Sequence, residues 1–173
     1  EPASRAAAAA TRNKRVGVLG TQGTINSNKY KDRIYGIDPE IEVVSKACPM
    51  FVPVVENGYA DSEIAAILAS EYLKPLIKAE VDTIILGCTH YPLLKNTIRK
   101  IVGGGVKLID SGAEAAKFAQ TRMADEGILT DREENGKVRY YVSDTVHGFE
   151  TIGRLFLNRK IVGQVSKIDI EKY

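Results

Sequence analysis

The stretch TIILGCTHYP, residues 83–92, decides the fold. Its first half, Thr83 to Gly87, is an aliphatic and β-branched run without polar alternation, which predicts a central strand of a parallel sheet covered on both faces. Its second half is a polar turn that ends at Pro92, and we expect a helix from Pro92 to about Val102. A buried strand that leads through a turn into a helix is the repeating step of an α/β fold.

Strands and helices are predicted to alternate on both sides of this stretch. The run RVGVLG (15–20) predicts a buried strand, and so does VKLID (106–110). Further predicted strands are 41–47, 138–142 and 162–168, and further predicted helices are 2–13, 25–34, 111–126 and 149–158. The polar stretch 130–137 predicts a hairpin or linker. The whole pattern indicates an α/β class with a mostly parallel sheet.

Three local signals refine these boundaries. Asp61-Ser62 is a candidate N-cap for a helix that runs to Ala79. The apolar face expected for that helix consists of Ile64, Ile67, Leu68 and Tyr72. Ser111 with Glu114 matches a capping box for the helix that follows. The segment 48–58 (CPMFVPVVENG) carries two prolines, so we expect a loop there that lies against the body of the protein.

The composition excludes several classes of function. A chain of 173 residues with 44% hydrophobic and 27% charged residues fits one domain or two small ones, with a core that needs no disulfide or metal. The net charge of +2 argues against a nucleic-acid partner and against an anionic membrane surface. No apolar run approaches a membrane span, and the start lacks the order of a signal peptide. Two cysteines without a CxxC pair predict reduced thiols and a cytoplasmic protein.

Unusual polar residues follow three of the predicted strands, where ligands bind in open α/β sheets. The stretches are Gly20–Thr24, Cys48-Pro49 and Gly87–His90. We expect Cys88 to face the positive end of the next helix, which favours a thiolate, and His90 to serve as acid, base or orienting partner. Thr89 can offer a hydroxyl and an amide to an anion. A buried structural cysteine beside a surface histidine fits the same residue types equally well.

Other candidates are weaker. Thr21 and Thr24 flank a glycine turn that can bind a small carboxylate, although a plain turn fits as well and the Walker pattern is absent. Glu56 is either a solvated loop residue or, if it lies near His90, a partner for that imidazole. The two histidines and two cysteines have no metal-ligand spacing, so no metal site is predicted.

Several motifs together resemble those of bacterial glutamate racemases. They are GVLGTQGT (17–24), KACPMFVPVVENG (46–58), LGCTHYPLL (86–94) and KLIDSGAEAA (107–116), in the family's order and at similar separations. The start EPASRAA (1–7) and the tail YYVSDTVHGFETIGRLFL (140–157) also resemble the family pattern. The resemblance implies a parallel-sheet, three-layer α/β/α domain of the aspartate/glutamate racemase type, with a C-terminal tail that belongs to a second, similar domain.

The resemblance also implies a function. It is the cofactor-independent interconversion of L- and D-glutamate by two cysteines on opposite faces of the substrate, which supplies D-glutamate for peptidoglycan. Residue by residue, Cys88 matches the second catalytic cysteine, His90 a group that assists proton transfer, and Glu56 the acid that supports His90. Thr21, Thr24 and Thr89 match positions that contact the substrate. Cys48 matches neither catalytic cysteine, so its structural interpretation stands.

One departure from the family pattern is important. The D-S-G-x-G-G and C-N-T motifs, the second of which carries the first catalytic cysteine, do not occur in this sequence. We therefore expect Glu1 to be an internal position of a longer enzyme and the 173-residue chain to be inactive alone. The expected organisation is a helix from the missing N-terminal domain (1–13), a catalytic half-domain (14–112) and a returning segment that completes the N-terminal domain (113–173).

Three alternatives remain open at this point. In the first alternative the chain is a non-catalytic binding or interaction module on the same half-fold. In the second it is a racemase of another acidic amino acid. A third alternative makes Cys48 and Cys88 the two bases, which requires their sulfurs to face each other across a pocket. Glutamate is the expected small-molecule partner, and a homodimer is a possible assembly.

Overall fold

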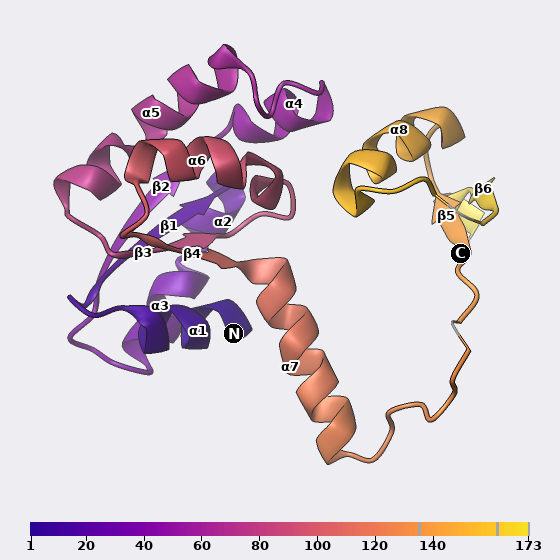
Figure 1. Ribbon diagram of the computed structural model, residues 1–173, viewed down its shortest axis with the longest axis horizontal. Helices are drawn as coiled ribbons and strands as arrows, with labels where there is room; N and C mark the ends of the chain where they lie inside the picture. The colour runs from indigo at the N-terminus through magenta and orange to yellow at the C-terminus, as the bar shows by residue number, and fades with distance from the viewer. Residues whose placement is uncertain (135, 162, 173) are drawn as a thin grey trace. The chain divides into compact units, whose positions relative to one another are not determined.

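Four parallel strands form the central sheet of the protein (Figure 1). The computed structural model describes residues 1–134, 136–161 and 163–172, and its contacts divide the chain into two units, Glu1–Ile128 and Leu129–Tyr173. The sheet lies in the first unit and has the strand order β2-β1-β3-β4. The strands are β1 (Arg15–Gly20), β2 (Glu42–Ala47), β3 (Thr83–Leu86) and β4 (Lys107–Asp110). All four predicted strands of this unit are confirmed to within one residue at each end.

Helices cover both faces of this sheet, which confirms the three-layer α/β/α fold. Ile84 and Leu86 of β3 pack in the core beneath α5 (Glu63–Lys78) and α6 (Lys95–Val102). Ile85, between them in the sequence, packs on the opposite face, in the core that α1 (Pro2–Ala10) and α3 (Lys29–Tyr35) cover. Successive side chains of a strand point to opposite faces, so a strand that is apolar throughout supplies both cores.

A glycine allows one of these helices to approach the sheet closely. A Cβ atom on Gly17, in the middle of β1, would lie 2.5 Å from Leu76 Cδ2 and 3.2 Å from Ile84 Cγ1. Leu76 of α5 therefore occupies the space above β1 that any larger residue at position 17 would fill. A glycine has no side chain to pack and lowers the stability of a strand. The packing of α5 against β1 offsets this loss.

The N-terminal helices differ in length from the prediction. The predicted helix 25–34 is two helices, α2 (Gln22–Asn26) and α3, because Asn28 adopts a left-handed conformation with φ 52°. The predicted helix 2–13 ends at Ala10, because the next residues bind Asp82 instead. Thr11 Oγ1 donates to Asp82 Oδ1 at 2.7 Å, and the Arg12 and Asn13 amides donate to Oδ2 at 2.7 and 2.8 Å.

The prediction of a loop over residues 48–58 is wrong in its centre. Residues Phe51–Glu56 form the helix α4 despite Pro53. The proline stands in the first turn of this helix, where the amide groups have no partner within the helix, so its missing N–H costs no bond. Phe51 is fully buried and contacts the rings of Tyr72 and Tyr91 edge-on, at centroid distances of 5.1 and 5.2 Å.

The predicted apolar face of α5 is half right: Leu68 and Tyr72 pack against the core, but the two isoleucines do not. Ile64 and Ile67 are 54% and 60% exposed. The residues that α5 buries are Ala65, Ala69, Leu73 and Leu76. Small alanines at the contact let the helix backbone approach its neighbours closely, and size decides the buried face here more than hydrophobicity. The Ser62 cap is confirmed, since its hydroxyl accepts from the Ala65 amide at 3.3 Å.

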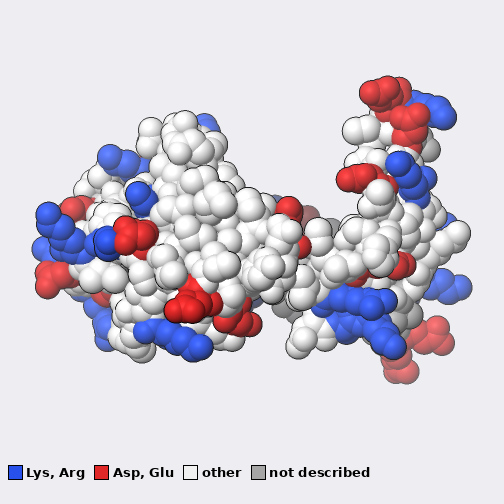
Figure 2. Space-filling model, turned by 90° about the horizontal axis from the view of Figure 1, so that it is seen from above, with Lys and Arg blue, Asp and Glu red and all other residues white. Residues whose placement is uncertain are grey.

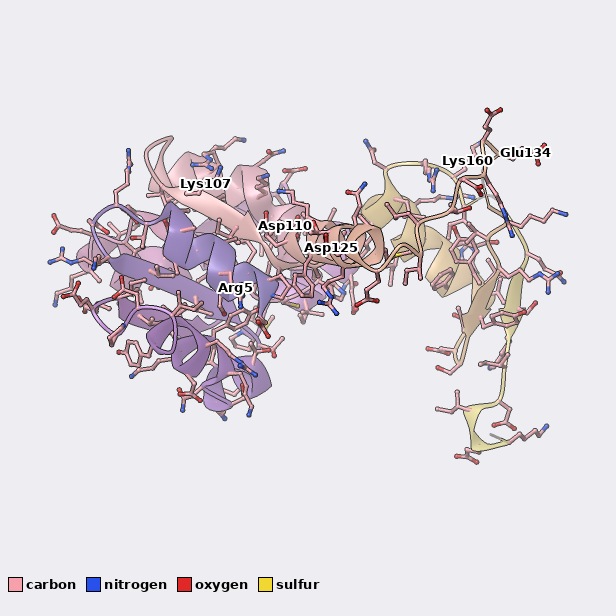
Figure 3. The ribbon with its side chains drawn as sticks, turned by 90° about the horizontal axis from the view of Figure 1, so that it is seen from below. Arg5, Lys107, Asp110, Asp125, Glu134 and Lys160 are labelled. Atoms are coloured by element: carbon pink, nitrogen blue, oxygen red, sulfur yellow. The ribbon has the colours of Figure 1, made fainter. Side chains whose placement is uncertain are left out.

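The cap of α7 (Ser111–Asp125) is Asp110 rather than Ser111. Asp110 Oδ1 accepts from the amides of Gly112 and Ala113 at 2.9 and 3.0 Å. Figure 3 shows Asp110 where β4 passes into α7, with Lys107 at the other end of the strand. The Ser111 hydroxyl donates instead to the Leu86 carbonyl at 2.8 Å, which ties the start of α7 to the end of β3.

The second unit is one β-α-β segment. Its strands β5 (Tyr140–Val142) and β6 (Val165–Lys167) pair in parallel, and α8 (Val146–Leu157) connects them. These elements confirm the predicted strand–helix–strand order of the tail, although Val162, the predicted start of the last strand, lies outside the described residues, as do Asn135 of the predicted linker and Tyr173. Within the described residues, no helix has the length and apolar character to span a membrane.

Candidate functional site

The strand order points to one place at the carboxyl ends of the strands as the candidate binding site. From β1 the chain continues to β2, which lies on one side of β1, and from β2 it crosses back to β3, which lies on the other side. The connections therefore leave in opposite directions on the two sides of the gap between β1 and β3. In open parallel sheets, ligands bind at such a switch point, outside the carboxyl ends of the strands. Thr21 directly follows β1, and Cys88 follows β3 after one glycine. Two of the three polar stretches singled out in the sequence therefore lie at the switch point.

Cys88 occupies a turn rather than a helix N-terminus. The residues after it form a short 3₁₀ helix, Tyr91–Leu94, and α6 begins only at Lys95. The effect of a helix dipole is confined to the first turn, so the expected dipole at Cys88 is absent. The turn is tight because the Tyr91 amide donates to the Cys88 carbonyl at 3.1 Å. The side chain of Cys88 is partly exposed, as a reacting thiol requires.

His90 joins Cys88 to Glu56. Its Nε2 lies 3.0 Å from Glu56 Oε1, and its Nδ1 lies 3.9 Å from Cys88 Sγ and 3.3 Å from Thr89 Oγ1. A carboxylate only accepts hydrogen bonds, so His90 donates its Nε2–H to Glu56. In the neutral ring Nδ1 then carries the lone pair and accepts from the thiol or the hydroxyl. The geometry can move a proton between Cys88 and His90, with Glu56 fixing the orientation of the ring.

Glu56 reaches this position because it is the last residue of α4. Its side chain is 44% exposed and that of His90 is 20% exposed, so the pair lies at the rim of the site and not in the core. The anchor of α4 is the buried Tyr91, whose hydroxyl donates to the Cys48 carbonyl at 3.1 Å. Burial raises the pKa of Tyr91 far above its usual value, so this donor keeps its proton. The sequence alternative of a solvated Glu56 without a histidine partner is wrong.

Thr21 and Thr24 form their own small cluster at the end of β1. Thr21 caps α2 by accepting from the Thr24 amide at 3.3 Å, and the two hydroxyl oxygens lie 3.0 Å apart. The stretch predicted as a turn is thus a helix start with two partly buried hydroxyls. Thr89, the third predicted substrate contact, is exposed beside His90.

Cys48 is buried and cannot share the role of Cys88. Its side chain has no exposed surface, and its Sγ donates to the Lys46 carbonyl at 3.6 Å. Burial raises the pKa of the Cys48 thiol to about 12, with the nearby Cys88 adding to the shift, so the thiol remains protonated at neutral pH. A protonated sulfur enclosed in the core cannot act as a base, which is evidence against the alternative that pairs Cys48 with Cys88.

Charge and metal ligands add little to this site. Among the residues that the structure describes, no group of three His, Cys, Asp or Glu side chains is placed to hold a metal ion. Figure 2 shows both signs of charge interspersed with neutral residues on the drawn face of the first unit, which agrees with the net charge of +2. The polar groups that the structure brings together at the site are a thiol, an imidazole, a carboxylate and hydroxyls.

Comparison with known proteins shows the family of the chain. The family model described as Asp/Glu/Hydantoin racemase matches residues 1–119, which include Cys88, His90, Glu56 and the threonine cluster. The chain belongs to this racemase family.

Relatives of the racemase chain are named glutamate racemases. One from Geobacter metallireducens is 47% identical over 171 residues, which is 99% of this chain and 63% of the relative. A solved glutamate racemase from Bacillus anthracis is 38% identical with a TM-score of 0.89, over 97% of this chain and 63% of its own. One from Francisella tularensis, solved in complex with D-glutamate, is 32% identical with a TM-score of 0.89, over 99% and 63%. The chain thus spans about 63% of the length of these relatives.

Two residues of this racemase chain lie beside Cys88 without having been predicted there. Tyr30 of α3 packs on Gly87, since a Cβ on that glycine would lie 3.0 Å from Tyr30 Cε2. Ser111 hydrogen-bonds the Leu86 carbonyl, two peptides before the cysteine, and also the Tyr30 hydroxyl. In the sequence, Gly87 was the signal of close packing before Cys88. A glycine alone does not indicate which residue packs against it.

Proposed function

We propose that Cys88 is one of the two bases of a cofactor-independent glutamate racemase. The observation that carries this proposal is the contact chain Cys88–His90–Glu56 at the switch point of the sheet. A thiol in hydrogen-bond range of an imidazole, which is itself oriented by a carboxylate, is the arrangement that proton transfer by a cysteine requires. The names of the relatives support glutamate as the substrate.

The proposed reaction removes the α-proton from one face of the α-carbon and adds a proton to the opposite face. The Cys88 thiolate takes the α-proton, so the C–H bond breaks, an S–H bond forms, and the electron pair passes to the α-carbon and its carboxylate. A second thiol on the opposite face then returns a proton, which gives the other enantiomer and leaves that sulfur as a thiolate. His90 then takes the proton from Cys88 and passes it to solvent, and the opposing thiolate takes a proton from solvent, so both sulfurs return to their starting states. The hydroxyls of Thr21, Thr24 and Thr89 hold the polar groups of glutamate.

The carbanion is the difficult intermediate in this scheme. Without a cofactor to accept the electron pair, only fixed dipoles and hydrogen bonds in a site that excludes water can stabilise it. Hydroxyl and amide donors at the ends of β1 and β3 are suited to the developing charge on the substrate carboxylate. The threonine pair is already ordered by its own hydrogen bonds, so binding does not have to organise it.

The second thiol in this proposal comes from outside the 173 residues. The sequence has two cysteines, and Cys48 is buried with a raised pKa. The relatives are longer than this chain, which leaves room for the segment that supplies the opposing base. In this proposal residues 1–13 enter from that segment, 14–112 form the catalytic half, and 113–173 return to complete the other domain. A homodimer, a cytoplasmic location and a supply of D-glutamate for peptidoglycan remain predictions that follow from the same assignment.

The test compares two cysteine variants of the full-length protein. Cys88→Ala should abolish racemisation in both directions, measured by the change in optical rotation of L- and D-glutamate. Cys48→Ala is the matched control and should retain most of the activity, because it removes a buried thiol that has no part in proton transfer. Turnover by Cys88→Ala at the wild-type rate would refute the role of Cys88.

The 173-residue chain gives a second test. We expect it to racemise glutamate negligibly, because one face of the α-carbon has no base. Substantial two-way racemisation by the purified chain would contradict the two-thiol proposal. In the binding-module alternative, the full-length protein binds glutamate yet does not exchange its α-proton with deuterium from the solvent. Racemases of other acidic amino acids are distinguished in the same assay by replacing glutamate with aspartate.

A further inference from the structure

Tyr30 lies against the turn that carries Cys88. A Cβ atom on Gly87 would lie 3.0 Å from Tyr30 Cε2 and 3.5 Å from Cζ, so the ring covers the backbone of the residue directly before the cysteine. The same Cβ would lie 2.7 Å from the Leu19 carbonyl oxygen of β1. The Gly87 backbone is thus enclosed between β1 and the Tyr30 ring. Cys88 projects from a peptide that cannot move toward either of them.

The hydroxyl of Tyr30 extends this contact to the start of α7. It hydrogen-bonds Ser111, whose own hydroxyl donates to the Leu86 carbonyl at 2.8 Å. The chain Tyr30–Ser111–Leu86 links α3, α7 and the end of β3 just before Cys88.

Cys88 is therefore held from both faces of the sheet. Glu56 belongs to α4, which packs in the core shared with α5 and α6, and it acts on Cys88 through His90. Tyr30 belongs to α3, which packs in the core on the opposite face. Burial raises the pKa of Tyr30, its bond to Ser111 lowers the pKa, and the nearby charge of Cys88 raises it further. Burial is the largest of these effects, so the pKa of Tyr30 is raised overall and the phenol keeps its proton at neutral pH.

We propose that Tyr30 is a positioning residue for Cys88, which fixes the thiol against His90 through the contact with Gly87 and the bond to Ser111. The proposal rests on the proposed role of Cys88 as a base. Displacing a catalytic base by about 1 Å can lower the reaction rate about 100-fold. Holding the turn that carries Cys88 in place is therefore important for the rate. Thr24 lines a small pocket together with Tyr30, but Thr21 and Thr24, which are to bind the substrate, are held by hydrogen bonds to each other, so substrate binding should change little.

The test is a double-variant cycle in the full-length protein. Tyr30→Leu should lower kcat at least about tenfold with KM changed less than about twofold, and Tyr30→Phe should restore most of the rate because the ring still covers Gly87.

The rate at which iodoacetamide alkylates Cys88 is then measured in Tyr30→Leu, in His90→Asn and in the double variant. If Tyr30 holds Cys88 against His90, the effect of His90→Asn should disappear once Tyr30 is replaced. Tyr35→Leu, on the same helix and 39% exposed, is the matched control and should leave both rates unchanged.

Each outcome bears on the proposal. Additive effects of the two substitutions on alkylation would overturn it, because they mean that Tyr30 and His90 act on Cys88 independently. If Tyr30→Leu fails to fold, Tyr30→Met, which fills much of the same space without a ring over Gly87, replaces it in the same cycle, and additivity there also overturns the proposal. If the wild-type protein does not racemise glutamate but the alkylation effects are non-additive, the proposed function fails while the positioning of Cys88 by Tyr30 stands.

Discussion

The replacement Gly87→Ala tests how tightly the structure holds the reactive turn. The new Cβ would lie 2.7 Å from the Leu19 carbonyl oxygen, which also accepts the Gly87 amide at 2.8 Å, and 3.0 Å from the Tyr30 ring. Side-chain Cβ atoms essentially never approach closer than 3.0 Å, and ordinary contact begins at 3.4 Å. The backbone at position 87 must therefore move by about 0.3–0.7 Å, which strains or breaks the last hydrogen bond between β1 and β3.

The energetic cost follows from these contacts. Overpacking of a close-packed site costs about 1–3 kcal/mol, and the lost hydrogen bond costs about 0.5–1.5 kcal/mol. The smaller entropy of the unfolded alanine chain returns about 0.4–1 kcal/mol. We expect a net loss of about 1–3 kcal/mol in the free energy of unfolding. The same displacement moves Cys88 away from His90, so the racemisation rate should fall about tenfold.

Urea unfolding and Cys88 alkylation measure the two effects in parallel. Gly104→Ala is the control, because a Cβ on Gly104 meets nothing within 4 Å and its φ lies outside the left-handed region. Gly104→Ala should change the free energy of unfolding by less than about 0.5 kcal/mol and leave the alkylation rate of Cys88 unchanged. A Gly87→Ala variant with the stability and alkylation rate of the control would refute the close packing described here.

Three further predictions concern the frame around the site. Asp110→Ala removes the cap of α7 and should lower the free energy of unfolding by about 1 kcal/mol in urea. Burial raises the pKa of Asp82, but bonds from Thr11, Arg12 and Asn13 outweigh it and hold the pKa below its usual value. Asp82 thus contributes stability above its unfolded pKa of about 3.9, which is lost as the pH falls through the lower folded pKa. Asp82→Asn should be less stable than wild type at pH 7 and lose less on acidification; equal acid profiles would contradict this. Glu56→Gln should lower kcat severalfold and change its pH profile, with little effect on unfolding because the pair lies at the rim.

The strands of the sheet were predicted from the sequence more accurately than the buried faces of the helices. Strands such as Thr83–Leu86 are apolar throughout because both faces are covered, and that pattern is independent of which helix covers them. The face of α5 was predicted by hydrophobicity, yet Ala65 and Ala69 are buried while Ile64 and Ile67 are exposed. Close approach of two elements selects small residues, and a hydrophobicity pattern contains no information about that distance.

The helix α4 was missed for a related reason. A proline prohibits a helix interior but is compatible with a first turn, and the position of the first turn depends on where the chain leaves β2. The proximity of Glu56 to His90 follows only from this helix, because the two residues are 34 positions apart in sequence. The resemblance to a family indicated their relation, but the physics of either segment alone could not.

The two cysteines show most clearly what the strand order adds to the sequence. Cys48 and Cys88 both follow a parallel strand, so local reasoning places both at the carboxyl edge of the sheet. Cys48 follows β2, the outer neighbour of β1, and is closed in beneath Phe51 and Tyr91 with no exposed surface. Cys88 follows β3, next to the switch point between β1 and β3, where open parallel sheets have a crevice at the ends of the strands. One thiol is therefore enclosed in the core and the other is partly exposed, and the order of the strands rather than the local sequence separates them.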